Sequence, residues 1–511
     1  MRLFRPSVLA FAPALVTFAI GACGARGGMD TFEAPRVTGL ARSVAGTGGT
    51  TASGAAGGAQ SAGAPATDAG VDAPLGVDAS PDATTALILC PVAPAGDPIE
   101  LVSYPDSPAG APRLLVVEPG QPGSPARVAI GTLKEQANVW HPEYRVTRAS
   151  VGLPWPSGTT LDQPSVVWGV DDHAWGELAR GPGGSIALLA NYGGELVAPE
   201  GLKFRPFDTA TWTPGTDVYV AMNGESPYGI ALGAGTGELG VGYAGVGYGV
   251  AYRSSPTQVG QSQPMAAVLA TDGKVLIGPF ATAPAAQYPG RAADVTWTGQ
   301  TYLVTTSNGP CDTVDPLCAP NAVVVLRIRP ASGDALDDSG IELVTTIPIL
   351  ASGTTPGRPI VATLDGDTFV AWSEGDAVDK MAPRTVRLAR VGPTGELASM
   401  PVVLAENAHP TTGLVTSAGA LGVLVGWGEA GDTKLPPKTP GSGLLALHHF
   451  DPKGAPVQPP LAIPTTQLQA FGRGMVVELT TPPSYLVAWS AESAGDAARP
   501  TFVTRLDCVS K

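Results

Sequence analysis

Apolar residues occur in short runs along most of the chain, and each run ends in a turn. The stretch Gly357–Ala405 shows the pattern most clearly. Its runs are Ile360–Leu364, Phe369–Ser373, Thr385–Arg390 and Met400–Leu404. Short runs bounded by Gly, Pro and Asp are typical of β-strands and too short for most helices. The stretch therefore predicts a unit of four short strands joined by turns.

A similar unit recurs about every sixty residues from residue 86 onward. The clearest marker is the second strand, which carries a tryptophan in several units. These second strands are Ala174–Gly176, Val250–Tyr252, Leu303–Ser307, Val370–Ser373, Val425–Gly428 and Val487–Ser490. All but the last are followed by a turn that ends in Gly194, Gly273, Gly333, Gly395 or Gly454. Glycine suits such hairpin turns because it adopts positive φ at little cost.

Four-stranded units repeated at this period resemble the blades of a β-propeller, in which neighbouring sheets cover each other's faces. We expect blades at residues 160–205, 212–283, 290–348, 357–405 and 414–463, another from residue 469, and a divergent first blade at 105–155. The fold class is thus all-β over residues 86–511, with seven blades, or six as the alternative. The indoles of Trp372, Trp427 and Trp489 are expected between adjacent sheets.

The last unit reaches its third strand at Thr501–Leu506 and then the chain stops. The segment Cys90–Val102 has the pattern of the missing fourth strand. We predict that it completes the last blade and that a disulfide between Cys90 and Cys508 holds it there. Cys311 and Cys318 are predicted to form a second disulfide within a loop. Paired cysteines are expected in an oxidising compartment.

The N-terminus reads as a targeting segment. Arg2 and Arg5 precede the apolar run Val8–Ile20, which is too short to span a bilayer comfortably. The run ends in Ile20-Gly21-Ala22-Cys23, which resembles the lipobox of bacterial lipoproteins. The resemblance implies a signal peptide over residues 1–22, cleavage before Cys23, and lipid such as palmitate on that thiol. Because no aspartate follows Cys23, it also implies an outer-membrane anchor that faces the periplasm or the cell surface.

Residues 23–85 are rich in Gly, Ala, Ser and Asp and poor in large apolar side chains. Such a composition cannot bury enough apolar surface to offset the entropy lost on ordering. We expect a lipid-anchored, disordered linker with a root-mean-square reach of roughly 40–50 Å. The membrane is then a partner through Cys23 alone.

The net charge of −14 at pH 7 bears on which kinds of partner the chain can bind. No Lys/Arg-rich block is present, so the composition argues against nucleic acid, which binds through phosphate contacts. We expect a monomer.

The pattern GxGxxG at Gly235–Gly240 continues into strand-like sequence, so it does not fit the strand–turn–helix context of a nucleotide site. The neighbouring His448 and His449 point to opposite faces of a strand. We expect no metal and no cofactor.

Two recurring features mark one face of the predicted propeller. Arginines stand just before the first strands, at Arg291, Arg358 and Arg473. Acidic residues occupy the loops after the second strands, at Glu374, Asp376, Asp432 and Asp496. Both kinds of loop emerge on the same face. An arginine ring there would hold a carboxylate or sulfate; the alternative is that each arginine pairs with an acid or a carbonyl of a neighbouring blade.

These features predict a binding or scaffold module for a protein or glycan partner rather than an enzyme. A glycoside hydrolase or lyase acting on polysaccharide is the first alternative, because propellers also carry such enzymes. The hydrolases need paired carboxylates near the channel, and the sequence alone assigns no such pair. A carboxylate pair at the axial mouth would favour this alternative. An envelope-assembly scaffold is the other alternative.

Overall fold

The computed structural model is all-β in the part of the chain that it describes, with strands, turns and no helix. Residues 1–86 lie outside that part, and so do Cys311, Cys318 and the Gly235–Gly240 segment. The described residues are 87–102, 112–134, 143–168, 176–180, 186–192, 201–220, 226–234, 247–255, 263–282, 291–308, 322–329, 340–349, 353–376, 378–379, 382–409, 414–429, 442–466, 468–470, 473–491 and 500–509.

Within these residues all paired strands are antiparallel, and the long strands of each sheet pair in the order in which they follow one another in the chain, as in a meander. The first sheet contains β3 (Arg113–Glu118), β4 (Ala126–Lys134), β5 (Glu143–Val151), β6 (Thr160–Leu161) and β7 (Ser165–Trp168). The second contains β8 (Gly176–Arg180), β9 (Ile186–Tyr192), β10 (Gly201–Asp208), β11 (Thr213–Pro214) and β12 (Val218–Val220). The third contains β13 (Ser226–Ala234), β14 (Tyr248–Ser255), β15 (Gln263–Leu269) and β16 (Val275–Ala281). The fourth contains β17 (Arg291–Trp297), β18 (Tyr302–Asn308), β19 (Ala322–Arg329) and β20 (Gly340–Pro348).

A nine-stranded sheet follows, and it consists of two meanders. One contains β21 (Thr354–Pro356), β22 (Ile360–Leu364), β23 (Asp367–Asp376), β24 (Arg384–Val391) and β25 (Val402–Ala408). The other contains β26 (Leu414–Gly419), β27 (Gly422–Glu429), β28 (Ser442–Phe450) and β29 (Leu461–Thr466). The two are joined through β25 and β27 by a single residue pair, Ala408 with Glu429. A shared apolar cluster that includes Phe369 and Trp427 lies between them, so they pack face to face like separate sheets.

The last sheet joins the two ends of the described chain. It contains β30 (Leu468–Ala470), β31 (Val476–Thr480), β32 (Pro483–Ala491) and β33 (Thr501–Cys508), together with β1 (Val92–Pro94) and β2 (Ile99–Val102). Both N-terminal strands pair antiparallel with β33, and Val92 lies opposite Cys508. A disulfide joins Cys90 to Cys508 across 418 residues of sequence. The predicted completion of the last sheet by the N-terminal segment is therefore confirmed, as is its disulfide.

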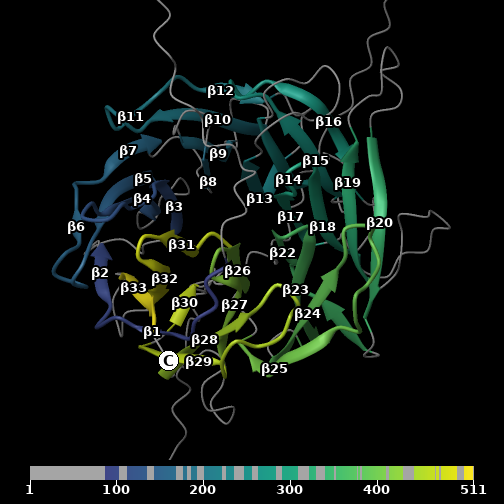
Figure 1. Ribbon diagram of the computed structural model, residues 1–511. Coiled ribbons are helices and arrows are strands. Elements are labelled where there is room, and N and C mark those ends of the chain that lie inside the picture. Colours follow the sequence, from purple (N-terminus) through teal and green to yellow (C-terminus); the bar gives the residue numbers. More distant parts are fainter. Residues whose placement is uncertain are drawn as a thin grey trace, which may run out of the picture.

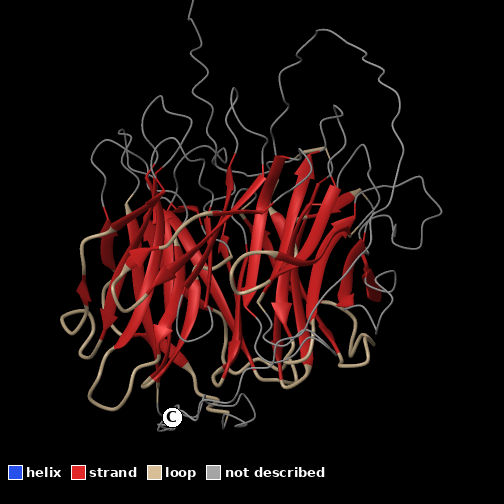
Figure 2. Ribbon diagram, turned by 90° about the horizontal axis from the view of Figure 1, so that it is seen from above, coloured by secondary structure: helices blue, strands red, loops and turns tan. Residues whose placement is uncertain are grey.

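The sheets are arranged around a common centre in a β-propeller-like manner (Figure 1). The strands of all sheets run between the same two ends of the molecule, and the C terminus lies at one of them (Figure 2). First strands of successive meanders contact one another in the order β3, β8, β13, β17, β22, β26 and β31, and β31 also contacts β3. Residues near the start of these strands are thereby brought toward one region from distant parts of the sequence.

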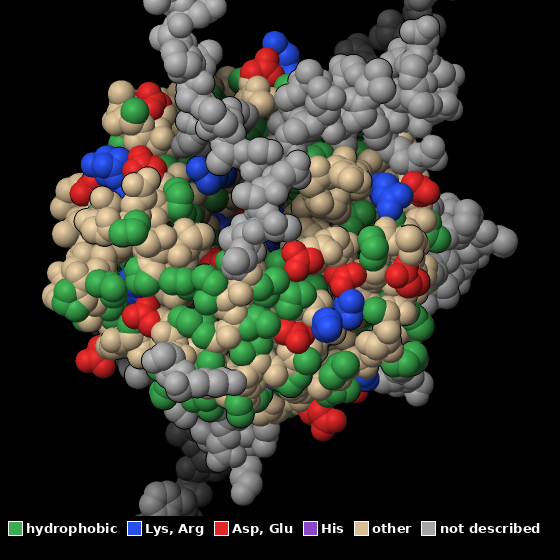
Figure 3. Space-filling model, in the orientation of Figure 1, with side chains coloured by type: hydrophobic (Ala, Val, Ile, Leu, Met, Phe, Trp, Pro, Cys, Tyr) green, Lys and Arg blue, Asp and Glu red, His purple; other side chains and the backbone are tan. Residues whose placement is uncertain are grey.

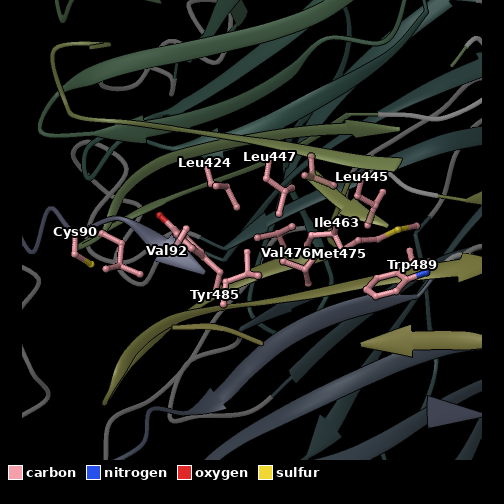
Figure 4. Packing of buried hydrophobic residues seen from close by; sticks show 14 residues of the cluster. Cys90, Val92, Leu424, Leu445, Leu447, Ile463, Met475, Val476, Tyr485 and Trp489 are labelled. Atoms are coloured by element: carbon pink, nitrogen blue, oxygen red, sulfur yellow. The ribbon is translucent and has the colours of Figure 1, made fainter. Parts of the chain in front are cut away.

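Three tryptophans of predicted second strands lie in the described residues and belong to the core, as predicted. Trp372, Trp427 and Trp489 are each 2% exposed or less. Each packs in an apolar cluster between sheets, where burying a large side chain contributes roughly 2–3 kcal/mol. Trp489 shares its cluster with Cys90, Val92 and Tyr485, so the N-terminal segment is part of the core of the closing sheet (Figure 4).

The predicted turns explain the register of the hairpins. Gly395 follows β24 with φ of 93°, and Gly454 follows β28 with φ of 81°. Residues with a Cβ rarely adopt such angles, so glycine is favoured at both turns. Each turn connects the third strand of a meander to the fourth, and this connection is the one that the disulfide replaces in the last sheet.

The predicted boundaries of the first blades are wrong. A blade was expected over residues 160–205, but Ser165–Trp168 in this range is β7, at the outer edge of the sheet that begins at Arg113. Gly176 was expected in a second strand, but it begins β8, a first strand. The short apolar run of an outer strand resembles that of a first strand, which explains the error. From β17 onward the expected and observed boundaries agree to within a few residues.

Candidate ligand-binding site

Five charged side chains converge where the first strands begin. Arg113 is the first residue of β3, Glu177 lies in β8 and Asp294 lies in β17. Arg358 precedes β22, and Arg473 precedes β31. We call these five residues the axial cluster. Their strands belong to five different meanders, so the cluster exists only because the sheets surround a common centre.

Arg473 connects the two carboxylates of the axial cluster. Its Nη1 donates to Glu177 Oε2 at 2.7 Å, and its Nε donates to Asp294 Oδ1. Arg113 Nε donates to the other oxygen, Glu177 Oε1, at 2.8 Å. The side chains of Glu177 and Asp294 are 5% and 3% exposed. Charges buried to this degree must be paired, because an unpaired one would cost several kcal/mol.

Asp294 also joins two sheets through the backbone. Its Oδ1 accepts the N–H of Val295 at 2.8 Å, and its Oδ2 accepts the N–H of Val361 in β22 at 3.0 Å. Both oxygens of Asp294 and both oxygens of Glu177 therefore already accept hydrogen bonds. Through these hydrogen bonds the two carboxylates hold neighbouring strands in position.

Burial and neighbouring charges shift the pKa values of Arg473 and Arg358 in opposite directions. Burial disfavours the Arg473 cation, but Asp294 and Glu177 outweigh burial and raise its pKa. Burial lowers the pKa of Arg358, and the attraction of Asp294 and Glu177 is opposed there by Arg473 and Arg113. The environment of Arg358 therefore favours its cation less than the environment of Arg473 does.

A cavity of about 180 Å³ adjoins the axial cluster. Its polar lining comes from Asp294, Arg473 and Thr416, and its apolar lining comes from Leu178, Ile360, Val361 and Val476. The Oγ1 of Thr416 is buried and has no hydrogen-bond partner among the described residues. A buried hydroxyl without a partner costs about 1–3 kcal/mol, so a water or a ligand group in the cavity would stabilise it.

The structure places the residues predicted from sequence in different roles. Arg358 and Arg473 lie in the axial cluster, and Arg291 begins β17, where its backbone pairs with Ser307. Asp432 and Asp496 lie outside the described residues. Glu374 and Asp376 lie in β23, outside the axial cluster.

Glu374 is buried in β23, where it accepts a hydrogen bond from Trp372 Nε1 at 3.0 Å and forms an ion pair with Arg387 at 2.8 Å. Asp376 is exposed at the end of the strand. Its Oδ1 accepts the N–H groups of Asp379 and Val378, and these hydrogen bonds lower its pKa. The first acid fixes a core indole, and the second fixes a turn.

Sequence reasoning missed Arg113, Glu177, Asp294 and Thr416. A signal for the acids exists in retrospect, because Glu177 and Asp294 each interrupt an apolar first strand. A charge in an otherwise buried run needs a partner, and the arginines before the other first strands are the matching cations. The sequence does not show which acid meets which arginine.

A second polar cluster lies near the other end of β31. Glu478 Oε1 accepts the N–H of Leu421 at 3.2 Å, and His449 Nε2 bonds to the carbonyl oxygen of the same residue. Ile88 donates its N–H to Ala420 at 2.7 Å, so the N-terminal segment rests on this turn. Glu478, His449 and the turn 419–422 therefore form one hydrogen-bonded group, which we call the turn cluster.

Burial dominates the titration of the turn cluster. It raises the pKa of Glu478 to about 7, against the hydrogen bonds from Leu421 and Ala420. Burial also lowers the pKa of His449 and raises that of Tyr485, whose ring lies 5.8 Å from the His449 ring. His448 faces the opposite side of β28, where it packs 4.3 Å from Phe450.

Outside these clusters, the face shown in Figure 3 carries acidic and basic side chains scattered among hydrophobic ones. Within the described ranges, no group of three or more His, Cys, Asp and Glu side chains is arranged to hold a metal ion. The same ranges contain no helix long and apolar enough to cross a membrane.

Comparison with known proteins gives likenesses of shape. No family model matches the chain, and no curated protein matches it. An α-L-arabinofuranosidase of Fusarium graminearum aligns over 65% of this chain and 92% of its own, with 11% identity and a TM-score of 0.43. An α-L-arabinanase of Penicillium chrysogenum aligns over 81% and 99%, with 12% identity and a TM-score of 0.38. A sialidase of Streptococcus pneumoniae aligns over 80% and 70%, with 8% identity and a TM-score of 0.37. Likenesses this low assign neither an activity nor a substrate to this chain.

Proposed function

We propose that the described sheets form a seven-bladed, closed β-propeller that binds a glycan at its axial cavity. Seven blades follow if the nine-stranded sheet counts as two, because one residue pair joins its halves. Closure is supported by the contact of β31 with β3 and by the disulfide between Cys90 and Cys508. A ring of this kind has one axis, and the cavity lies beside it.

The cavity lining carries the proposal. Sugars present hydroxyl groups that both donate and accept hydrogen bonds, beside apolar C–H faces. Asp294, Arg473 and the Thr416 hydroxyl offer acceptors and donors, and Leu178 and Ile360 offer apolar contact. Sites for small molecules combine a few convergent polar groups with apolar walls in this way.

Binding of oligosaccharides to the purified full chain tests the proposal by isothermal titration calorimetry. Thr416→Val removes the buried hydroxyl and keeps the side-chain shape. One hydrogen bond contributes about 1 kcal/mol, so we expect about a fivefold weaker affinity. Thr480→Val, at an exposed position of β31, is the matched control and leaves affinity unchanged. Absence of binding to any oligosaccharide, or equal affinity in Thr416→Val, contradicts the proposal.

Hydrolysis of a polysaccharide is a second candidate function, because Arg473 brings Glu177 and Asp294 together at the axis. Paired carboxylates are the machinery of most glycoside hydrolases, but one of them must carry a proton that it donates. Every oxygen of both acids here already accepts a hydrogen bond from an arginine or a backbone N–H, so neither offers a free oxygen to a leaving group, which favours binding over catalysis. Release of reducing ends by the full chain, lost in Asp294→Asn, would favour hydrolysis.

We also propose that the chain is a lipoprotein of the cell envelope, anchored through Cys23. The support is the sequence Ile20-Gly21-Ala22-Cys23 after a short apolar run. An anchor of this kind would present the axial cavity to envelope glycans or proteins, in the periplasm or at the surface. Metabolic labelling with radioactive palmitate tests the anchor, and a Cys23→Ser variant that still incorporates label contradicts it.

A further inference from the structure

We propose that the turn cluster is a pH-sensitive latch, which fastens residues 87–90 to the sheets while Glu478 is protonated and loosens them when Glu478 is ionised. The inference does not depend on the proposed glycan binding, because Glu478 lies near the opposite end of β31 from the axial cluster. It rests on the contacts of the N-terminal segment, on the hydrogen bonds of Glu478 and on the groups that surround this carboxyl group.

The N-terminal segment rests on the turn 419–422 through few contacts. The N–H of Ile88 donates to the carbonyl oxygen of Ala420 at 2.7 Å. Leu89 lies beside Gly422, where a Cβ atom would come within 3.3 Å of Leu89 Cδ2. Ile88 and Leu89 are 40% and 45% exposed, so little apolar burial helps to hold them. Whether these two residues stay in place therefore depends on the position of the turn.

Glu478 contacts the same turn. Its Oε1 accepts the N–H of Leu421 at 3.2 Å. Its Oε2 is buried and has no hydrogen-bond partner among the described residues. A side chain at Gly419 would collide with this oxygen, so the carboxyl group packs directly on the backbone of the turn. A neutral carboxyl group is tolerated in such a place far better than an ionised one, whose unpaired buried oxygen would carry charge.

The polar groups nearest to Glu478 are neutral. Tyr485 lies opposite Glu478 in the pairing of β31 with β32, and its hydroxyl is buried without a partner among the described residues. His449 bonds through Nε2 to the carbonyl oxygen of Leu421, which places its proton on Nε2 and leaves a lone pair on the buried Nδ1. Burial lowers the pKa of His449, so this ring supplies no cation near pH 7.

The other described elements packed against this part of β31 add no counter-ion. β26 contains no titratable residue, and residues 87–92 carry no charged side chain. On β3, Arg113 belongs to the axial cluster, and Glu118 forms an exposed ion pair with Arg127. His448 faces the opposite side of β28, and burial lowers its pKa too. An ionised Glu478 can therefore be stabilised only by water.

Water reaches Oε2 of Glu478 most easily if the turn 419–422 moves. β31 is fixed by its pairing with β32, whereas the turn lies at the end of the β26–β27 hairpin. A turn that moves away takes the carbonyl oxygen of Ala420 from the N–H of Ile88. The segment then loosens only as far as Cys90, because the disulfide and the pairing of β1 hold the chain from there onward.

The direction of the pH effect follows from the burial of Glu478. Burial raises the pKa of its carboxyl group from 4.5 to about 7, against the N–H groups of Leu421 and Ala420. In the loosened form water reaches the carboxyl group, so its pKa returns toward 4.5. The fastened form therefore binds the proton more tightly. It is fully favoured below pH 4.5, and this advantage is lost as pH rises through about 7.

Amide hydrogen exchange of the full chain tests the latch, followed by mass spectrometry on peptides that cover residues 87–90 and 419–422. After correction for the pH dependence of the chemical exchange step, we expect the opening of both segments to increase about tenfold from pH 5 to pH 8. Opening that does not change with pH overturns the proposal, even if the stability of the whole domain falls. Exchange of residues 87–90 that is no faster than that of β23 also overturns it, because the segment would then open only with the whole domain.

Two neutral variants assign the effect to Glu478. Glu478→Gln keeps an oxygen for the N–H of Leu421 but carries no charge, so we expect the opening of residues 87–90 to become independent of pH. Glu100→Gln, at an exposed position of β2, is the matched control and keeps the wild-type pH dependence. If Glu478→Gln fails to fold, Glu478→Met supplies a neutral side chain of similar length with the same expected result. A wild-type pH dependence in whichever neutral variant folds assigns the opening to another group and overturns the proposal.

Discussion

Glu478→Gln is predicted to stabilise the protein at alkaline pH and to leave it nearly unchanged at pH 5. The glutamine keeps an oxygen that accepts the N–H of Leu421, but it carries no charge in the buried turn cluster. The pKa of Glu478 is raised from 4.5 to about 7 by burial. The folded state therefore binds this proton more tightly than the unfolded state does, and stability falls as pH rises between these values.

The magnitude follows from the same two values. A difference between 4.5 and about 7 corresponds to about 3 kcal/mol if the group is fully shielded from water. Because Glu478 is only partly buried, solvent screening reduces the effect, and we expect about 1.5 kcal/mol. The wild type should lose this amount as pH rises from 5 to 8, and Glu478→Gln should not.

Urea denaturation of both proteins at pH 5, 6, 7 and 8 measures the effect. His448 and His449 shift stability in the opposite direction, because burial lowers their pKa, so stability is lost as pH falls. Comparing variant with wild type at each pH cancels that contribution. Glu100→Gln, at an exposed position of β2, reports the effect of removing an exposed carboxylate. A difference between Glu478→Gln and wild type that does not change with pH would refute the reasoning.

Three further predictions concern the fold and the anchor. Replacing Cys90 and Cys508 together by serine should lower the free energy of unfolding by up to about 6 kcal/mol, which is the chain-entropy limit for so long a loop. A loss below about 1 kcal/mol in urea titrations would contradict the closing role of the disulfide. In the same titrations, Trp427→Ala should lower the free energy of unfolding by about 3–5 kcal/mol. Val378→Ala, at a side chain that is 92% exposed, should hardly change it. Similar losses in the two variants would exclude a core role for the Trp427 indole. Cys23→Ser should move the chain from the detergent phase to the aqueous phase in phase-separation assays, and retention in detergent would argue against lipid on this thiol.

Local patterns in the sequence were sufficient to predict the strands and the closure. The runs around Phe369–Ser373 and the turn at Gly395 are set by neighbouring residues, and the structure has strands and a positive φ there. The disulfide was predictable because Cys508 ends a third strand that no fourth strand follows in the sequence, and Cys90 begins a segment with the pattern of a fourth strand.

The axial cluster was predictable only in part, because its contacts are set by the arrangement of the sheets. The arginines at Arg358 and Arg473 recur at equivalent positions, so their place before first strands was visible. Arg473 meets Glu177 and Asp294 across 296 and 179 residues of sequence. No local pattern fixes which sheets face each other across the centre, so the acids could not be assigned to the arginines. The cavity, which depends on those pairings, was not predicted.

The bond between Cys90 and Cys508 also determines how the domain bears mechanical load. Cys90 lies beside the end of β33, so tension applied through the N-terminal segment reaches the closing sheet at that cysteine. Without the bond, tension would be resisted only by noncovalent contacts: the pairing of β1 and β2 with β33, the hydrogen bonds of Ile88 to Ala420 and of Val92 to Gln458, and the packing of Val92 in the core, which can break one after another. With the bond, tension passes covalently to β33, which is held on both sides by paired strands. The domain can therefore be held by its N-terminus under strain without opening at the junction of its first and last strands.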